Sequence, residues 1–152
     1  VAGGGLAPAL RDALSSSSCR LVIVVINAVD DWLAKGDQAF VEWSVDAIPV
    51  LQSLLEIAHL QGRTLVLASD HGHVLERGSR YISGSGAERY RQPSIDVHEG
   101  EMTVKGGRVV DGPCVVAIRE NLRFTQGKRN GYHGGLTPQE VLPVFAVLCP
   151  AP

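Results

Sequence analysis

Aspartate and histidine side chains occur at three points of this sequence where they could together bind a divalent metal ion. Asp70 and His71 directly follow an apolar run, in the stretch LVLASDHGH. Asp30 follows an earlier apolar run, and His133 stands in a glycine-rich loop near the C-terminus. Carboxylate oxygens and imidazole nitrogens without cysteine suit zinc or manganese. These residue types predict a metal site, provided that the fold brings the three segments together.

Each of these residues also has a simpler interpretation. Asp70 could be a polar residue at the end of a strand, and His133 could be an exposed loop histidine. Asp30 and Asp31 could begin a helix as N-cap residues. The metal hypothesis gains weight only because all three segments are expected at the same edge of the protein.

The elements that must position these residues form a strand–helix–strand unit. Residues 21–26, LVIVVI, are apolar throughout and β-branched from Val22 on, which is typical of a strand buried on both faces. Residues 46–61 have apolar side chains at helical spacing, with Asp46 as a candidate N-cap and Gly62 as a stop. Residues 63–69 form a second short apolar run. This order favours a right-handed crossover, and so an α/β fold with a mostly parallel sheet flanked by helices.

In an open α/β sheet, ligands bind beyond the carboxyl ends of the strands. Asn27, Asp30 and Asp31 follow the first predicted strand, and Asp70 and His71 follow the second. The crossover geometry therefore brings these two groups to one edge of the predicted sheet.

The middle of the chain is different in character. Residues 75–112 are polar and rich in glycine and arginine, which predicts a largely irregular, partly β insertion. Within it, residues 101–112 predict a hairpin that turns at Gly106 and Gly107. Residues 113–121 then resume strand character.

The C-terminal stretch predicts a loop, a short helix and a last strand. Thr137 and Glu140 have the spacing of a capping box, and Pro138 suits the first helical position. Residues 143–149 form the expected last strand.

Composition narrows the class of protein. The chain has 152 residues, 45% of them apolar, and a net charge of −2, which fits one domain with a real core and gives no electrostatic argument for nucleic acid. Three widely spaced cysteines (Cys19, Cys114 and Cys149) do not predict a disulfide framework, which favours a reducing, cytoplasmic location. Every apolar run is too short to span a bilayer, so no membrane partner is expected.

Arginines in the insertion could contact a substrate. They are Arg77, Arg80, Arg89 and Arg91. A guanidinium group suits phosphate oxygens, so Arg80 and Arg89 are candidate substrate contacts. The alternative is a solvated loop held by ion pairs of these arginines with Glu76 and Glu88.

Several of these motifs resemble a known family. ASDHG after an apolar run, followed late in the chain by YHGGLTPQEVLPVFAV, is similar to the alkaline phosphatase superfamily. More closely, VVINAVDDWLAKGDQ, ERGSRYISGSGAERYR and NGYHGGLTPQEVLPV resemble the PglZ domain. The resemblance covers residues 21–148. It implies an alkaline-phosphatase-like fold and a metal-dependent phosphatase or phosphodiesterase of bacterial phage-defence systems of the BREX and phage-growth-limitation type.

The resemblance also implies a ligand set for up to two ions, zinc or else manganese. Asp70 and His71 match the pair that binds one metal, and Asp30 and His133 match ligands of the other. Many members of the superfamily have a histidine four residues after this aspartate, where the present chain has Ala34. Asp31 or a water could fill that position.

The surroundings of this ligand set are less sharply implied. Ser69 and Asn27, with Asp31, are candidates to hold the outer nitrogens of the ligand histidines. The implied substrate is a phosphate ester or nucleotide, and the implied partners are proteins of a defence complex.

The nucleophilic serine or threonine of the superfamily has no counterpart in residues 1–20. We therefore expect residues 1–20 to be a linker or the end of a preceding segment, and residues 21–152 to be the C-terminal part of the domain. The nucleophile is expected upstream, and the chain by itself is expected to be nearly inactive.

Two other functions fit the same residues. The chain could be a non-catalytic assembly module of the defence complex, which Ala34 favours. It could also be a response-regulator-like domain that binds magnesium through Asp30 and Asp31, but such a domain would have more regular strand–helix alternation than residues 75–112 allow.

Overall fold

Two units divide the chain in the computed structural model, which describes residues 6–37, 41–84, 86–93, 96–107, 109 and 114–150. The first unit comprises residues 1–30, 40–67 and 145–152, and the second unit comprises residues 31–39 and 68–144. One boundary falls inside helix α2 (Ala28–Leu33) and another inside strand β1 (Leu65–Ala68). Each unit has its own apolar cluster.

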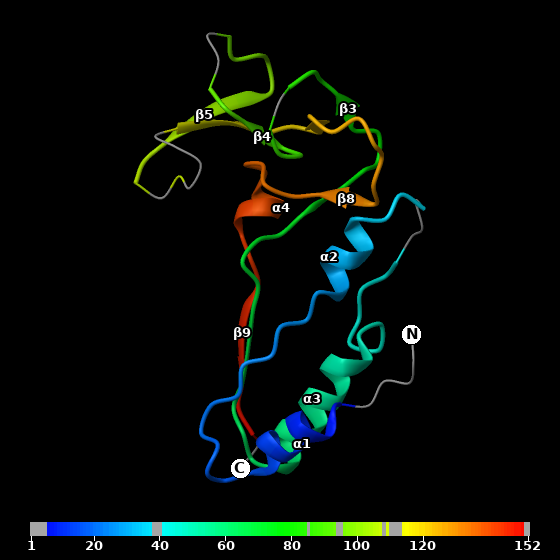
Figure 1. The fold of residues 1–152 in the computed structure, drawn as a ribbon, viewed down its shortest axis with the longest axis vertical. Coiled ribbons are helices and arrows are strands. Elements are labelled where there is room, and N and C mark those ends of the chain that lie inside the picture. The colour runs from blue at the N-terminus through cyan, green and yellow to red at the C-terminus, as the bar shows by residue number, and fades with distance from the viewer. Residues whose placement is uncertain are drawn as a thin grey trace. The chain divides into compact units, whose positions relative to one another are not determined.

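The first unit is built on two helices, α1 (Pro8–Ser15) and α3 (Pro49–Leu60), which contact each other (Figure 1). Leu14 and Leu54 are buried between these elements. The Arg63 guanidinium donates hydrogen bonds to the carbonyls of Ser16 and Cys19, at 2.7 and 2.6 Å, and so holds the end of α1. Apolar packing and one arginine fix this unit.

Helix α3 is shorter than its sequence pattern predicted. It begins at Pro49, and its N-cap is Ile48 without a side-chain cap bond, so the prediction of Asp46 as the cap is wrong. Proline suits the first helical position because the amide hydrogen that it lacks has no partner there. The helix ends at Leu60, just before the predicted stop at Gly62.

The β-branched residues 21–26 are extended but are not part of a strand. Val22, Val24 and Ile26 pack against the apolar cluster of the helices, whereas Leu21, Ile23 and Val25 are 75–80% exposed. The prediction of a strand buried on both faces is therefore wrong for this chain. The alternation of strand geometry is retained, with one apolar side turned to solvent.

The sheets also correct the predicted topology. Strand β1 pairs with β9 (Phe145–Leu148), and the two lie side by side in Figure 1. The Ser69 amide, just after β1, donates to the carbonyl of Val144, just before β9, at 3.0 Å, as in an antiparallel pair. The described sheets have two or three strands and are mostly antiparallel, so the mixed α/β class is confirmed and the mostly parallel sheet is not found.

In its described part, the second unit contains seven complete short strands, the helix α4 and the end of α2. The strands are β2 (Val74–Leu75), β3 (Arg80–Tyr81), β4 (Tyr90–Arg91), β5 (Glu101–Lys105), β6 (Cys114–Ile118), β7 (Leu122–Arg123) and β8 (Gly131–Tyr132). Strand β2 pairs antiparallel with β8, β3 pairs parallel with β7, and β4, β6 and β5 form an antiparallel sheet. Ile118, Leu122 and Phe124 form its apolar cluster.

The predicted hairpin is present only in part. Its first strand is β5, which ends at Lys105 before the predicted turn. Most of the predicted second strand, residues 108 and 110–112, lies outside the described residues. Strand β5 pairs instead with β6, from Glu101 opposite Ile118 to Lys105 opposite Cys114.

Helix α4 (Pro138–Val141) has the predicted start. Pro138 stands at the first helical position, and the Glu140 side chain accepts a hydrogen bond from the Thr137 amide, as in a capping box. Across the described part of the chain, α4 and the other helices all lack the length and hydropathy of a membrane span.

Candidate functional site

Two of the predicted metal-binding segments meet in the second unit. Strand β2 runs antiparallel to β8, with Val74 opposite Tyr132. The residues just before β2 therefore lie beside those just after β8. The His71 and His133 rings are stacked, with centroids 4.1 Å apart and planes 10° from parallel. The prediction that these two histidines come together is confirmed.

A tight turn after β1 presents Asp70 and His71. The His71 amide donates to Asp70 Oδ1 at 3.1 Å, and the Gly72 amide donates to the Glu140 carbonyl at 2.9 Å. A Cβ atom at Gly72 would lie 1.8 Å from the Gln139 carbonyl oxygen. Only glycine fits there, so the turn is held directly against α4.

The environment of His71 suits a metal ligand. Its Nδ1 lies 3.0 Å from the Gly72 carbonyl oxygen, which fits the tautomer with the proton on Nδ1. Nε2 is then the nitrogen with a free lone pair, and it lies 3.7 Å from Asp70 Oδ1. The Asp70 side chain is 88% exposed and that of His71 is 28% exposed. A carbonyl that orients the far ring nitrogen is common among metal-binding histidines.

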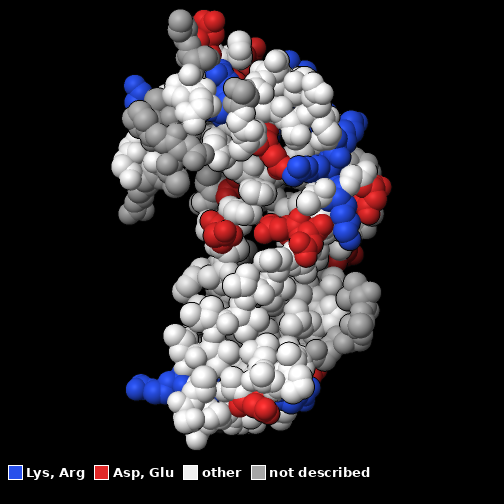
Figure 2. Space-filling model, in the orientation of Figure 1, with Lys and Arg blue, Asp and Glu red and all other residues white. Residues whose placement is uncertain are grey.

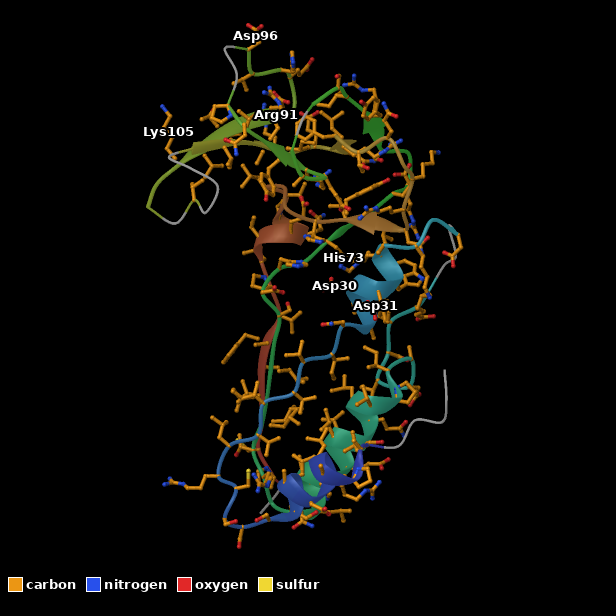
Figure 3. The ribbon with its side chains drawn as sticks, viewed as in Figure 1. Asp30, Asp31, His73, Arg91, Asp96 and Lys105 are labelled. Atoms are coloured by element: carbon orange, nitrogen blue, oxygen red, sulfur yellow. The ribbon has the colours of Figure 1, made fainter. Side chains whose placement is uncertain are left out.

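The remaining predicted ligand and its neighbours are on or near α2. Asp30 and Asn27 belong to the first unit, whereas Asp31 belongs to the second. Figure 3 labels Asp30 and Asp31 at helix α2. All three are exposed. The role of Asp30 as a ligand, and of Asn27 and Asp31 as supporting residues, stays a prediction.

The segment after Asp31 is fixed within the second unit. The Asn130 side-chain amide donates to the Trp32 carbonyl at 2.9 Å and to Asp37 Oδ1 at 2.8 Å. The Asn130 backbone amide lies within hydrogen-bonding distance of the Leu33 carbonyl. The end of α2 is thus tied to the residue before β8, three residues before His133.

The carboxylate and imidazole donors of the predicted site are of types that bind divalent ions. Their described positions, however, do not form a complete set of metal ligands. Within the described ranges, no group of three or more histidine, cysteine, aspartate or glutamate residues is placed to hold a metal. In the second unit the candidates are Asp70 and the two stacked imidazoles. Ser69 is tied to the backbone, since its Oγ accepts from the Val144 amide at 3.3 Å.

Arg89 occupies a different environment from the predicted substrate contact. It is fully buried, and its Nε donates to Glu140 Oε1 at 2.6 Å while its Nη2 donates to Glu140 Oε2 at 3.0 Å. It also donates to the carbonyls of Leu122 and Glu120. A substrate outside the protein cannot reach this guanidinium, so Arg89 is a structural residue here.

Glu140 is the other half of this buried pair and is 2% exposed. Burial alone would raise its pKa, but hydrogen bonds from Arg89 and Thr137 and the charge of Arg89 outweigh it. The pKa of Glu140 is therefore lowered, and the side chain is ionised at neutral pH.

Glu76 and Glu88 form ion pairs with cationic residues other than the four arginines of the prediction. Glu76 lies 3.6 Å from Arg123 and 3.8 Å from Lys128, and Glu88 pairs with Arg129. Arg91 is buried against Glu101. Glu76 and Glu88 therefore do hold this region by ion pairs, and the partners recorded for them are Arg123, Lys128 and Arg129.

Arg80, the second candidate substrate contact, is exposed on β3. Its backbone is fixed by a 3.0 Å hydrogen bond from its amide to the Asn121 carbonyl. Its side chain is exposed to solvent, and its role as a substrate contact stays a prediction.

A cavity of about 420 Å³ lies next to the histidine turn in the second unit. It is lined by His73, Val74, Leu75, Arg77, Glu120, Asn121, Thr137 and Gln139. The sequence analysis considered Arg77 as one of the arginines of the insertion and Thr137 as part of a capping box. It did not identify Asn121 or Gln139. No local signal could have found those two, because the cavity joins three separate segments.

A match to a known family covers Asp30, Asp70 and His71, whereas His133 lies beyond the matched residues. A family model described as the BREX system PglZ alkaline phosphatase-like domain matches residues 6–99, more than half of the chain. No curated protein sequence matches the chain.

Proposed function

Because this chain belongs to the PglZ family, the alkaline phosphatase-like domain of BREX systems, we propose that it carries metal-binding residues of a phosphatase or phosphodiesterase that acts in phage defence. The stacking of His71 on His133 is the observation that supports this proposal most directly. The two histidines come from segments far apart in the sequence, and imidazole nitrogens together with a carboxylate are donor types that suit a divalent ion.

The proposed ligands follow from the donor chemistry. Asp70 and His71 would hold one ion and His133 would hold a second, and Asp30 stays a candidate metal ligand from the family resemblance. A bound zinc or manganese ion would supply positive charge to stabilise an attacking or leaving oxygen of a phosphate ester. Both imidazoles must be neutral to bind, so metal affinity should fall as the pH falls.

The remaining roles concern the substrate. Arg80 is exposed and would contact a phosphate oxygen. The cavity that begins at His73, two residues after His71, would hold the organic group of the ester. Its lining combines apolar side chains (Val74 and Leu75) with amides (Asn121 and Gln139) and opposite charges (Arg77 and Glu120), which suits an organic group with apolar and polar parts, such as a nucleoside.

The nucleophile is not assigned to any residue of this chain. We propose that it comes from another part of a longer PglZ protein, that the protein acts in the cytoplasm, and that it works with other proteins of its defence system. The chain alone would then bind metal but turn over substrate poorly.

A second function is favoured by Ala34. Where many members of the superfamily have a histidine four residues after the metal-binding aspartate, this chain has alanine. A non-catalytic assembly module would tolerate that change.

A hydrolysis assay on a longer PglZ protein that contains this chain distinguishes the catalytic function from the assembly module. We expect metal-dependent hydrolysis of bis-p-nitrophenyl phosphate, lost in Asp70→Ala and in His133→Ala. His59→Ala is the matched control, because His59 is exposed on α3 in the first unit. Equal activity in all four proteins would overturn the catalytic proposal, and a wild type without activity would favour the assembly module.

A further inference from the structure

The two histidine loops are connected through one residue, Glu140, by its backbone carbonyl on one side and its carboxylate on the other. The Asp70–His71 turn is held by the Gly72 amide, which donates to the Glu140 carbonyl. The loop after His133 is held by the Gly135 amide, which donates to Glu140 Oε1 at 2.8 Å. No other described residue is bonded in the structure to both loops through these glycines.

Close packing makes this connection stiff. A Cβ atom at Gly135 would lie 2.6 Å from Glu140 Oε2 and 2.8 Å from Arg89 Nε, and a Cβ atom at Gly72 would lie 1.8 Å from the Gln139 carbonyl oxygen. Gly72 thus packs directly on the backbone of α4, and Gly135 packs directly on the Glu140 carboxylate. A shift of Glu140 would be passed to both loops.

Arg89 fixes Glu140 in turn. Its guanidinium forms two bonds to the carboxylate, and its remaining bonds go to carbonyls of Glu120 and Leu122. Thr137 adds its hydroxyl, which donates to Glu140 Oε2 at 2.7 Å. A paired carboxylate with this many donors has one position, and removing one partner leaves an uncompensated buried charge.

We infer that Glu140, locked by Arg89, is a positioning residue that holds His71 and His133 in contact. It acts through the two glycines and touches neither imidazole in the contacts described above. The inference rests on the proposed function only in one respect, namely that the contact serves metal binding. The contact itself is measured without metal or substrate.

A second buried ion pair in the same unit provides the control. Arg91 Nη2 donates to Glu101 Oε2 at 2.6 Å, and both side chains are buried. Glu101 also accepts from the His98 amide at 2.8 Å. This pair is matched in type, burial and distance, but its histidine neighbour is His98.

The experiment is histidine-ring NMR on the 152-residue chain without metal, comparing Glu140→Gln with Glu101→Gln. We expect Glu140→Gln to lose the nuclear Overhauser cross-peak between the His71 and His133 rings and to leave His98 unshifted. Glu101→Gln should shift His98 and keep the cross-peak. A folded Glu140→Gln that keeps the cross-peak, or a Glu101→Gln that loses it, would overturn the inference.

If Glu140→Gln does not fold, Thr137→Ala takes its place, because it removes one donor to Glu140 and leaves the ion pair intact. It should weaken the same cross-peak, and an unchanged cross-peak would contradict the inference. A zinc titration then tests the purpose of the contact: the apparent Kd should rise about 10–100-fold in Glu140→Gln relative to Glu101→Gln. A wild type that binds no zinc would remove the proposed function and leave the NMR comparison decisive for positioning.

Discussion

In the first unit apolar side chains meet one another, whereas in the second unit buried carboxylates meet arginines. The first unit is organised around Leu6, Leu14 and Leu54. The second unit buries Glu76, Glu101 and Glu140, each near a cationic partner. Figure 2 shows the same contrast on one face: acidic and basic side chains gather over the second unit, and the face of the first unit is mostly uncharged.

The difference matters because the two kinds of interaction constrain loops differently. Apolar contacts are non-directional and tolerate small shifts. A buried, doubly bonded ion pair has one geometry, although its net contribution to the free energy of folding is small. The unit that holds the two stacked histidines is the one with directional bonds in its interior. These pairs fix the geometry of the loops that they join, and the unit is destabilised when one partner of a pair is removed.

Each unit contains one tryptophan, which makes the comparison measurable. Trp43 lies in the first unit and Trp32 in the second. A Trp43→Phe background reports unfolding of the second unit by fluorescence, and a Trp32→Phe background reports the first.

The largest expected effect is on the buried pair. Arg89→Met should destabilise the second unit by about 3–5 kcal/mol, because Glu140 is left charged and buried without its partner. Urea unfolding in the Trp43→Phe background measures this change. A loss of less than about 1 kcal/mol would mean that the pair does not hold the unit together.

The matching change in the first unit is Leu54→Ala. Leu54 is 5% exposed in the apolar cluster, so the cavity should cost about 2–5 kcal/mol. Urea unfolding in the Trp32→Phe background should show the loss. An equal loss reported by both tryptophans would show that the two units unfold together. Their stabilities could then not be compared separately.

Acid should affect the second unit first. Burial alone would raise the pKa of Glu76, Glu101 and Glu140, but hydrogen bonds and nearby positive charges lower each below its ordinary value of 4.5. Such carboxylates contribute stability that is complete above the unfolded pKa and is lost as pH falls through the lower, folded pKa. Titration of the two single-tryptophan proteins from pH 6 to pH 3 should therefore show the Trp32 signal change at the higher pH. The reverse order would contradict this account.

The smallest expected effect is on the exposed apolar side of residues 21–26. Ile23→Thr should change the free energy of unfolding by less than about 0.5 kcal/mol, because Ile23 is 80% exposed. Val24→Ala, one residue along and packed against the cluster, is the control and should cost more. A large loss in Ile23→Thr would mean that another surface covers this side in solution.

The sequence predicted the local elements of this fold better than their assembly. Helix α3, the capping box at Thr137 and Glu140, and the last strand follow from periodicity and cap chemistry, which are local signals. The prediction of a mostly parallel sheet was not borne out. The apolar run at residues 21–26 indicates extended geometry, but it does not indicate which strands would pair with it. Strand pairing depends on long-range contacts that such a pattern does not contain.

The candidate site, like the fold, was predicted in part: its motifs were recognised, and its long-range side-chain contacts were not. The meeting of His71 and His133 was predicted from motifs and is confirmed. The burial of Arg89 was missed, because arginine in a polar stretch normally faces solvent and its partner Glu140 is 51 residues away. Glu140 was identified only as a helix cap, since a capping box explains its spacing without any further contact.

The most direct test of the central claim, that His71 and His133 form one metal-binding corner, is metal content. The chain is dialysed against zinc or manganese, freed of excess ion, and measured by mass spectrometry beside His133→Ala and His59→Ala. The account predicts stoichiometric metal in the wild type and in His59→Ala, and a clear loss in His133→Ala. Metal retained in full by a folded His133→Ala chain, or absent from the wild type, would contradict it.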